Sequence, residues 1–369
     1  MEILNEDLTL LRDSARGYLM EKHPVTAFRA LRDAGKTQDP TALKEMAEMG
    51  WMGILLPEEA GGVDFGCRAA GLIATEIGRN LTVVPFLSSA ILSAVVLRRC
   101  GGKALATWGS RIATGEATVA IALDEGAKHR PDRLGATVTQ DGDGLVLNGR
   151  KSMVVDGNAA DRLIVAARQG EELVFLSLDP STAGVFMTPQ VTLDGRDVAQ
   201  VHFEDVKLAQ DAVLASGSDA ESAVAGALNV GRAVAAAEQL GVAQAAAEQT
   251  WEYLKTRKQF GTEIGRFQAL QHRAAHLYSE LEQTGSLIAA ALNALDAGDE
   301  EAEALSRAAK AKAARTGQLA TEEGVQMHGG IGMTDEMDLG LFMKRDRALA
   351  EFLGDAGMHT EWLLRSKGL

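Results

Sequence analysis

The amino-acid sequence predicts an α+β protein with an N-terminal helical domain, a middle antiparallel β domain and a C-terminal helical bundle. Apolar residues recur at helical spacing to about residue 115, at a period close to two from 116 to 215, and at helical spacing again from 216 to 369. The middle third does not alternate strands with helices, which argues against a Rossmann fold. We therefore predict three domains, over residues 1–115, 116–215 and 216–369.

The first 115 residues contain two stretches of helical periodicity. Leu8, Leu11 and Tyr18 mark the first stretch, and the apolar residues between Leu43 and Met49 mark the second. The segment Pro57-Glu-Glu-Ala-Gly-Gly62 interrupts this pattern, because proline and paired glycines are typical of turns. These features predict short helices joined by turns.

The middle of the chain contains short segments rich in β-branched and aromatic residues. They are Val119–Leu123, Leu145–Leu147, Leu163–Val165, Leu173–Leu176 and Val198–Phe203. Clusters of turn-forming residues separate several of them. Short strands separated in this way predict an antiparallel β domain.

Three long alanine-rich stretches dominate the last third of the chain, over 233–256, 270–297 and 302–325. Alanine and leucine favour helix intrinsically. Because these stretches carry few polar residues on several faces, we expect them to pack on one another and on neighbouring subunits. A plain helical bundle without a ligand is the simplest alternative.

Composition and charge exclude several classes of protein. The formal net charge of −14 argues against a nucleic-acid surface, because phosphates would be repelled. Because the chain has only two cysteines, we do not expect a disulfide scaffold. We expect a reducing, cytoplasmic location instead. The N-terminus lacks the pattern of a signal peptide, and the apolar patch Ala90–Leu97 is too short to span a membrane. No metal site is expected.

Two segments of the C-terminal third carry residues suited to an anionic cofactor. Arg257-Lys-Gln-Phe-Gly261 follows the first long helix, and Gln326-Met-His-Gly-Gly-Ile-Gly332 follows the third. Arginine donates charge-assisted hydrogen bonds to a pyrophosphate, and glycines let backbone N–H groups approach a phosphate closely. Phe260 and Phe267 offer aromatic faces. A basic residue followed by glycine also ends many ordinary helices, but both segments in one domain favour a cofactor site.

Together these segments resemble the paired flavin-binding signatures of the acyl-CoA dehydrogenase family, and the resemblance covers nearly the whole chain. It implies FAD, an acyl-CoA substrate, α,β-dehydrogenation and an electron-transferring flavoprotein as the electron acceptor. It also implies that the ADP half of a flavin shared between subunits is held by Arg257, Gln259, Phe260, Ile264, Phe267, Gln268, Gln326, Gly329 and Gly330. Arg232 matches an arginine that helps to hold the CoA or acyl portion, although a helix-surface salt bridge is an equal alternative.

The residue that should act as the catalytic base is altered. The family's reaction uses a carboxylate to remove the α-proton of the substrate. The two positions that usually hold this glutamate correspond to Gly231 and Gly354. Asp355 is the nearest substitute, but aspartate also caps helices well, and we favour that structural role. Glu351 and Glu238 are further candidates.

The β domain departs from the family as well. The segment Ala122-Leu-Asp-Glu-Gly126 lacks the threonine and proline with which family members contact flavin and CoA. The segment 148–157 keeps an Asn-Gly-x-Lys frame, but it has Met153 and Val155 where tryptophan and threonine commonly meet the flavin ring. Valine cannot hydrogen-bond flavin N5 as threonine can. The pocket for the flavin ring therefore looks weakened, whereas the ADP side looks intact.

Three hypotheses follow from this asymmetry. The chain resembles the small or partner subunit of bacterial heteromeric acyl-CoA dehydrogenases. The first hypothesis is therefore that the chain is a subunit for fatty-acid or steroid degradation that works in a homo- or hetero-oligomer, a dimer or tetramer, with a paralogous partner carrying the base. Alternatively, it is a flavoenzyme of the same fold with different chemistry. Thirdly, it is a non-catalytic structural or binding subunit that kept the fold and lost the flavin.

Overall fold

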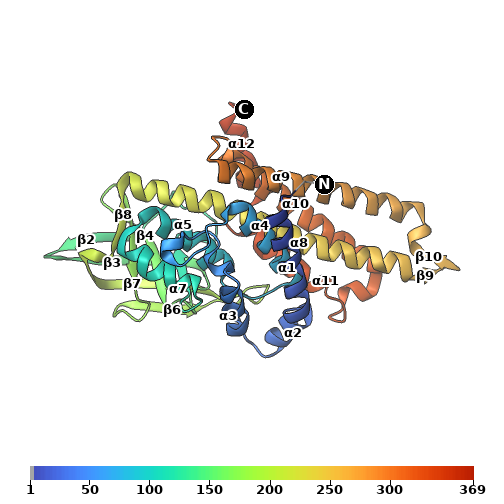
Figure 1. Cartoon of the computed structure of the whole chain (residues 1–369), viewed down its shortest axis with the longest axis horizontal. Helices are drawn as coiled ribbons and strands as arrows, with labels where there is room; N and C mark the ends of the chain where they lie inside the picture. Colours follow the sequence, from blue (N-terminus) through green and yellow to red (C-terminus); the bar gives the residue numbers. More distant parts are fainter. Residues whose placement is uncertain (1–3) are drawn as a thin grey trace. The chain divides into compact units, whose positions relative to one another are not determined.

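The computed structural model describes residues 4–369 (Figure 1). By its internal contacts the chain divides into two compact units, each made of segments that are not contiguous in sequence. A helical unit comprises 4–30, Cys67–Thr82 and Arg232–Leu369, and a β unit comprises Leu31–Gly66 and Val83–Gly231. The three domain boundaries that the sequence suggests stay a prediction.

The helical unit is built mainly from long helices. Its elements are α1 (Glu6–Lys22), most of α2 (Val25–Asp33), α4 (Gly66–Asn80), α8 (Gly217–Thr256) from residue 232 onward, a short hairpin of β9 (Lys258–Gln259) and β10 (Thr262–Glu263), η6 (Ile264–Arg266), α9 (Gln268–Ala297), α10 (Ala302–His328), η7 (Gly329–Met333), α11 (Leu339–Glu351) and α12 (Ala356–Ser366). In Figure 1, α9 runs beside α10, against which it packs. The predicted C-terminal helical region is confirmed.

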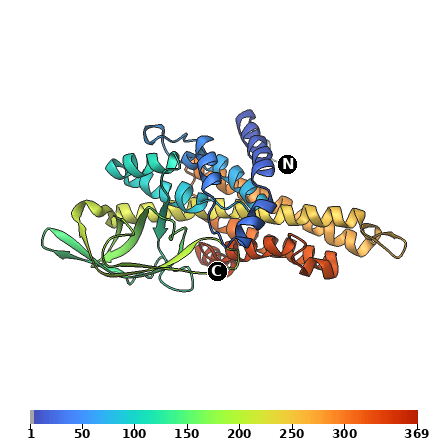
Figure 2. The same cartoon turned by 90° about the horizontal axis from the view of Figure 1, so that it is seen from below.

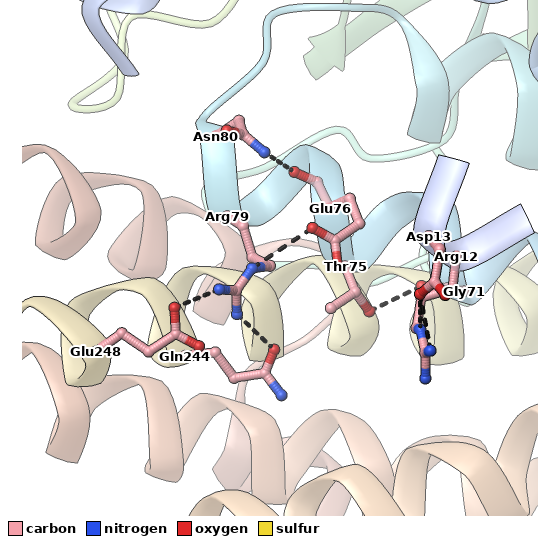
Figure 3. Close-up of polar contacts among 9 residues, drawn as sticks. All are labelled: Arg12, Asp13, Gly71, Thr75, Glu76, Arg79, Asn80, Gln244 and Glu248. Carbon is pink, nitrogen blue, oxygen red and sulfur yellow. Dashed lines mark hydrogen bonds and ion pairs between the residues drawn. The ribbon is translucent and has the colours of Figure 1, made fainter. Parts of the chain in front are cut away.

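Close contact between α4 and α8 depends on two glycines. A Cβ atom on Gly241 would overlap the carbonyl oxygen of Thr75, and one on Gly78 would overlap that of Glu238. Arg79 of α4 adds polar contacts to α8, because its guanidinium donates to Gln244 Oε1 at 3.2 Å and also pairs with Glu248 (Figure 3). Small residues here let the two backbones approach each other, and the arginine fixes their register.

The β unit begins with short helices. They are α3 (Pro40–Glu48), η1 (Trp51–Gly53), η2 (Glu58–Ala60), the π-helix η3 (Phe86–Ser93), α5 (Ala94–Cys100), α6 (Gly102–Ala104), the π-helix η4 (Leu105–Gly109) and α7 (Ser110–Ala113). Asp39 caps α3 by accepting from the backbone N–H groups of Thr41 and Ala42. The predicted turn after Pro57 contains η2, which ends at Gly61 with a φ of 75°.

The strands of this unit form one sheet, visible as the green segment in Figure 2. They are β1 (Val119–Ala122), β2 (Thr137–Asp141), β3 (Gly144–Val155), β4 (Arg162–Gln169), β5 (Glu172–Leu178), β6 (Val185–Pro189), β7 (Val198–Ala209) and β8 (Val213–Ser216), in the order β6-β7-β3-β2-β4-β5-β8 with β1 on β4. A short 3₁₀ turn, η5 (Gln210–Ala212), lies between β7 and β8.

The predicted β domain is confirmed, but its sheet is mixed rather than wholly antiparallel. β4 pairs in parallel with both β1 and β2, and the other pairings are antiparallel. Parallel neighbours require a long connection, and the β2–β3 hairpin lies in the connection from β1 to β4. The period-two pattern finds strands but does not reveal their relative direction.

Candidate functional site

The first predicted cofactor segment forms a hairpin directly after α8. β9 and β10 pair antiparallel, and the turn between them places Phe260 at a φ of 52° and Gly261 at 83°. Arg257 and Gln259 are exposed, and Phe260 is 93% exposed. The ring of Phe260 meets that of Phe267 edge-on, with 6.2 Å between centroids. This hairpin presents a cation and two aromatic faces at the surface of the helical unit.

The second predicted cofactor segment forms the end of α10. Gly329 has a φ of 66°, which ends the helix, and Gln326, Gly329 and Gly330 are exposed. Nothing lies within 4 Å of the positions that Cβ atoms on Gly329 and Gly330 would take. The N–H of Gly329 donates to the carbonyls of Val325 and Gln326, while the space beside both glycines is open, which lets a phosphate approach the backbone closely.

Packing beneath the surface brings these two segments together. Leu254, Ile264 and Met327 form one buried cluster, so that the hairpin segment rests on the end of α10. The ring of Tyr253 stacks on that of His328 with 4.2 Å between centroids. Ile264, predicted as a cofactor residue, lies largely inside this cluster. Gln268 opens α9 at an exposed position. The arrangement of an exposed arginine, aromatic rings and open glycines fits an ADP-type ligand.

The predicted base region is the turn between α11 and α12. Gly354 is buried with a φ of 106°, a conformation that residues with a side chain rarely adopt. Asp355 caps α12, because its Oδ1 accepts from the N–H of Met358 at 2.8 Å. Glu351 is exposed at the end of α11. Glu238 is 2% exposed and pairs with Arg345 at 3.3 Å. The role of Asp355 as a base stays a prediction.

Two buried cations hold the backbone of this turn. Arg232 Nε donates to the carbonyl of Leu353 at 3.5 Å, and Lys310 Nζ donates to the carbonyls of Ala350 at 3.1 Å and Gly354 at 3.4 Å. Burial lowers the pKa of Arg232 to about 9, and repulsion from Arg307 adds to the shift. Burial likewise lowers the pKa of Lys310 to about 8. Substrate contact by Arg232 stays a prediction. Cations near a helix C-terminus stabilise its free carbonyls.

Family models match both ends of the chain. The N-terminal domain of acyl-CoA dehydrogenase matches residues 5–116, and its C-terminal domain matches residues 222–367. An acyl-CoA dehydrogenase, IpdE2 of Mycolicibacterium smegmatis, is 30% identical over 95% of this chain and 96% of its own length. The chain belongs to the acyl-CoA dehydrogenase family. It is therefore an FAD-dependent oxidoreductase of acyl-CoA thioesters.

Other relatives agree with this membership. The 3-(aryl)acrylate reductase of Clostridium sporogenes is 30% identical over 85% of this chain and 86% of its own. The steroid acyl-CoA dehydrogenase Tcur3481–Tcur3483, solved as a variant, is 27% identical, with a TM-score of 0.89 over 99% of both chains. Butyryl-CoA dehydrogenase of Megasphaera elsdenii, 21% identical, shares the fold with a TM-score of 0.92 over 100% of both chains.

In the β unit, the two segments that differ from the family pattern, 122–126 and 148–157, bind each other. The N–H of Ser152 donates to the carbonyl of Asp124 at 2.7 Å. Lys151, which is fully buried, pairs with Glu125 at 2.6 Å and donates to the carbonyl of Leu123. Burial raises the pKa of Glu125, but the hydrogen bond and charge of Lys151 and the backbone N–H groups of Ala136 and Gly135 together bring that pKa below its ordinary value. These side chains stabilise their own loop.

Met153 and Val155 lie at an irregular part of β3. The pairing of β3 with β7 shifts register between Lys151 and Val154, and Met153 there has a φ of 53° and is 53% exposed. Asp124 also accepts from His129 Nδ1 at 2.8 Å, so the loop after β1 is closed by a further internal bond. The sequence gives no indication that Lys151, Lys310 or His129 are buried, because each stands in a stretch that also reads as polar surface.

No helix among residues 4–369 is long and apolar enough to cross a membrane. Within the same part of the chain, no group of histidine, cysteine or carboxylate side chains is arranged to hold a metal ion.

Proposed function

We propose that this chain is a subunit of a heteromeric acyl-CoA dehydrogenase whose own active site is degenerate. A paralogous subunit would supply the catalytic glutamate, and this chain would supply the ADP clamp for a flavin shared between them. The observation that carries the proposal is the absence of a carboxylate side chain at both usual base positions, Gly231 and Gly354. The φ of 106° at Gly354 supports it, because a glutamate there would be strained.

Bound FAD would accept the hydride from the β-carbon of the substrate. Arg257 would donate to the pyrophosphate, and the open backbone at Gly329 and Gly330 would let the same anion approach closely. Phe260 and Phe267 would cover an aromatic ring, while Gln259, Gln268 and Gln326 would add neutral hydrogen bonds. In the β unit, Val155 would leave flavin N5 without the hydrogen bond that a threonine provides.

Solved relatives with two-part names support a partner. One is the ChsE4–ChsE5 complex of Mycobacterium tuberculosis, 22% identical with a TM-score of 0.91 over 100% of this chain and 99% of that one. Another is the Tcur3481–Tcur3483 steroid enzyme. We infer a steroid or fatty acyl-CoA as the substrate, an electron-transferring flavoprotein as the acceptor and a cytoplasmic location. A solved electron-transferring flavoprotein of Acidaminococcus fermentans also carries a chain of this fold.

Anaerobic flavin bleaching tests the proposal. The isolated chain and its complex with a glutamate-bearing paralog are mixed with a panel of steroid and fatty acyl-CoAs. Because loss of a positioned base typically costs about 10²–10⁴-fold in rate, the isolated chain should bleach weakly or not at all and the complex rapidly. Fast bleaching by the isolated chain that is lost in Asp355→Asn would make Asp355 the base and overturn the need for a partner. Asparagine caps helices as well as aspartate, so this variant keeps α12 intact.

Arg257→Ala should weaken FAD retention of the assembled protein. The substitution removes a charge-assisted hydrogen bond worth about 1.5–3 kcal/mol, which corresponds to roughly tenfold to a hundredfold in affinity. Flavin release during gel filtration, followed by fluorescence, measures the effect. Lys258→Ala is the matched control, because Lys258 lies next in the same hairpin and pairs only at 3.6 Å with Glu263. If the two variants retain FAD equally well, Arg257 does not bind the cofactor.

A second candidate is reduction of an activated double bond, which the likeness to the 3-(aryl)acrylate reductase favours. Reoxidation of the chemically reduced flavin by an arylacrylate, faster than by any enoyl-CoA, would support it. A protein that stays colourless even with its paralog would instead support the non-catalytic alternative.

A further inference from the structure

The helical unit contains a cavity that none of the predicted cofactor residues lines. Its volume is about 280 Å³, and it lies among α1, α4, α8 and α9. The lining combines three arginines, two glutamates and several aliphatic side chains. Sites for small ligands are typically apolar cavities in which a few polar groups fix the orientation of the ligand. The composition of this cavity therefore suits a small amphipathic molecule.

Arginines from two helices give the cavity positive charge. Arg12 and Arg16 lie one turn apart on α1, and Arg68 lies in the first turn of α4. Arg12 pairs with Asp13 of its own helix at 2.7 Å, whereas no hydrogen bond or ion pair joins Arg16 to a residue that the structure describes. Arginine binds carboxylates through two parallel hydrogen bonds. The guanidinium of Arg16 is available for such a contact.

Glu76 is the buried anion of this cavity. It is 4% exposed, and its Oε2 accepts no hydrogen bond within the described part of the chain. Arg79 Nε lies 3.5 Å from that oxygen, and the same guanidinium also binds Gln244 and Glu248 (Figure 3). Burial raises the pKa of Glu76, while the charges of Arg79 and Arg16 oppose the rise. A buried carboxylate oxygen without a donor is costly, and a ligand ammonium would supply that donor.

Aliphatic side chains form the rest of the wall. Leu72 of α4, Leu240 of α8, and Leu281 and Ile288 of α9 line the cavity, and all four are buried. Gly285 leaves room beside them, because a Cβ atom there would meet only Leu240 Cδ2, at 3.6 Å. The cavity can therefore hold a short branched aliphatic chain as well as charged groups.

We propose that this cavity binds a free aliphatic α-amino acid, such as leucine, as a zwitterion. The carboxylate of the ligand pairs with Arg16, and Arg12 and Arg68 add positive charge. The ammonium group donates to Glu76, and the aliphatic side chain contacts the leucine and isoleucine wall. A fatty acid would leave Glu76 without a donor, and a simple amine would leave the arginines without a counter-charge. The inference does not rest on the proposed function, because none of these residues takes part in it.

Isothermal titration calorimetry of the full chain with matched ligands tests the assignment. L-Leucine, L-isoleucine or L-valine should bind and raise the melting temperature. Isocaproate is leucine without its ammonium group, and isoamylamine is leucine without its carboxylate. Each should bind about tenfold more weakly than leucine, or weaker still, because each loses a charge-assisted contact.

Variants separate the two charged contacts. Glu76→Gln should weaken leucine binding about tenfold or more, but it should bind isocaproate at least as well as wild type does. A merely structural role for Glu76 would weaken both ligands alike. Arg16→Gln should weaken leucine and isocaproate but not isoamylamine. Glu282→Gln is the matched control, because Glu282 lines the same cavity at an exposed position, and it should bind leucine within about twofold of wild type.

Gly285→Leu should abolish binding of all three kinds of ligand, because the new side chain would fill the cavity. Circular dichroism and the melting temperature without ligand report whether each variant folds. No binding of any of the three amino acids at millimolar concentrations, equal affinity for leucine and isocaproate, or wild-type leucine affinity in folded Glu76→Gln would overturn the assignment. These titrations need neither flavin turnover nor a paralog, so their failure leaves the proposed function untouched, and failed flavin bleaching leaves the amino-acid site untouched.

Discussion

Alanine at position 241 should cost the helical unit about 3 kcal/mol or more of its free energy of unfolding. The new methyl group would overlap the carbonyl oxygen of Thr75 and lie 3.0 Å from the backbone nitrogen of Arg79. Both obstacles are backbone atoms of α4, so no side chain can turn aside and the helices must separate. Separation would also stretch the Arg79 contacts to Gln244 and Glu248 drawn in Figure 3.

Urea unfolding followed by circular dichroism measures this loss, and Gly285→Ala is the matched control. Gly285 lies inside α9, and a Cβ atom there would meet only Leu240 Cδ2 at an ordinary 3.6 Å. Since alanine exceeds glycine in helix propensity by about 1 kcal/mol, the control should be neutral or more stable than wild type. Equal stability of the two variants would mean that α4 and α8 are not in the contact described.

Asp346→Asn should change how stability depends on pH. Asp346 is 1% exposed, and burial raises its pKa to about 7, against a hydrogen bond from Gln239 at 2.7 Å that opposes the shift. The folded protein therefore binds more protons than the unfolded chain between about pH 4 and pH 7. The stabilisation that the protonated Asp346 gives to the folded protein is complete below about pH 4 and is lost as the pH rises through about 7.

The expected size follows from the shift of about three pH units. At roughly 1.4 kcal/mol per unit, wild type should lose about 4 kcal/mol relative to Asp346→Asn between pH 4 and pH 8. Urea unfolding of both proteins across that range measures the difference. Asp13→Asn, at a side chain 60% exposed on α1, is the control that should follow wild type at each pH. A constant difference between wild type and Asp346→Asn would show that Asp346 does not titrate in this range.

Periodicity recovers the elements whose burial follows a regular pattern. The helices of the C-terminal third and the strands around residues 120, 146, 164, 174 and 200 were all predictable from it. The π-helix Phe86–Ser93 was not, because all of its residues are buried and no polar face marks a period. β2 and β6 were missed for the opposite reason, since most of their residues are exposed or half-buried and alternate weakly.

The candidate site divides in a similar way. Arg257 and Gly329 could be predicted, because each belongs to a short contiguous motif at the end of a helix. Lys310 and Gly354 lie together only because α10 folds against the turn between α11 and α12. Nothing near Lys310 in the sequence distinguishes it from Lys312, two residues later, which is only half-buried and pairs with Glu280.

The burial of Lys151 and Lys310 has a practical consequence for chemical probing. Both amines are 0% exposed, and each is bound to backbone carbonyls of its own unit. Amine-reactive labels should pass over them in the native protein while modifying surface lysines such as Lys44 and Lys258. Labelling at position 151 would then report opening of the β unit, and labelling at 310 opening of the helical unit, so that peptide mapping could time the two events separately in one sample.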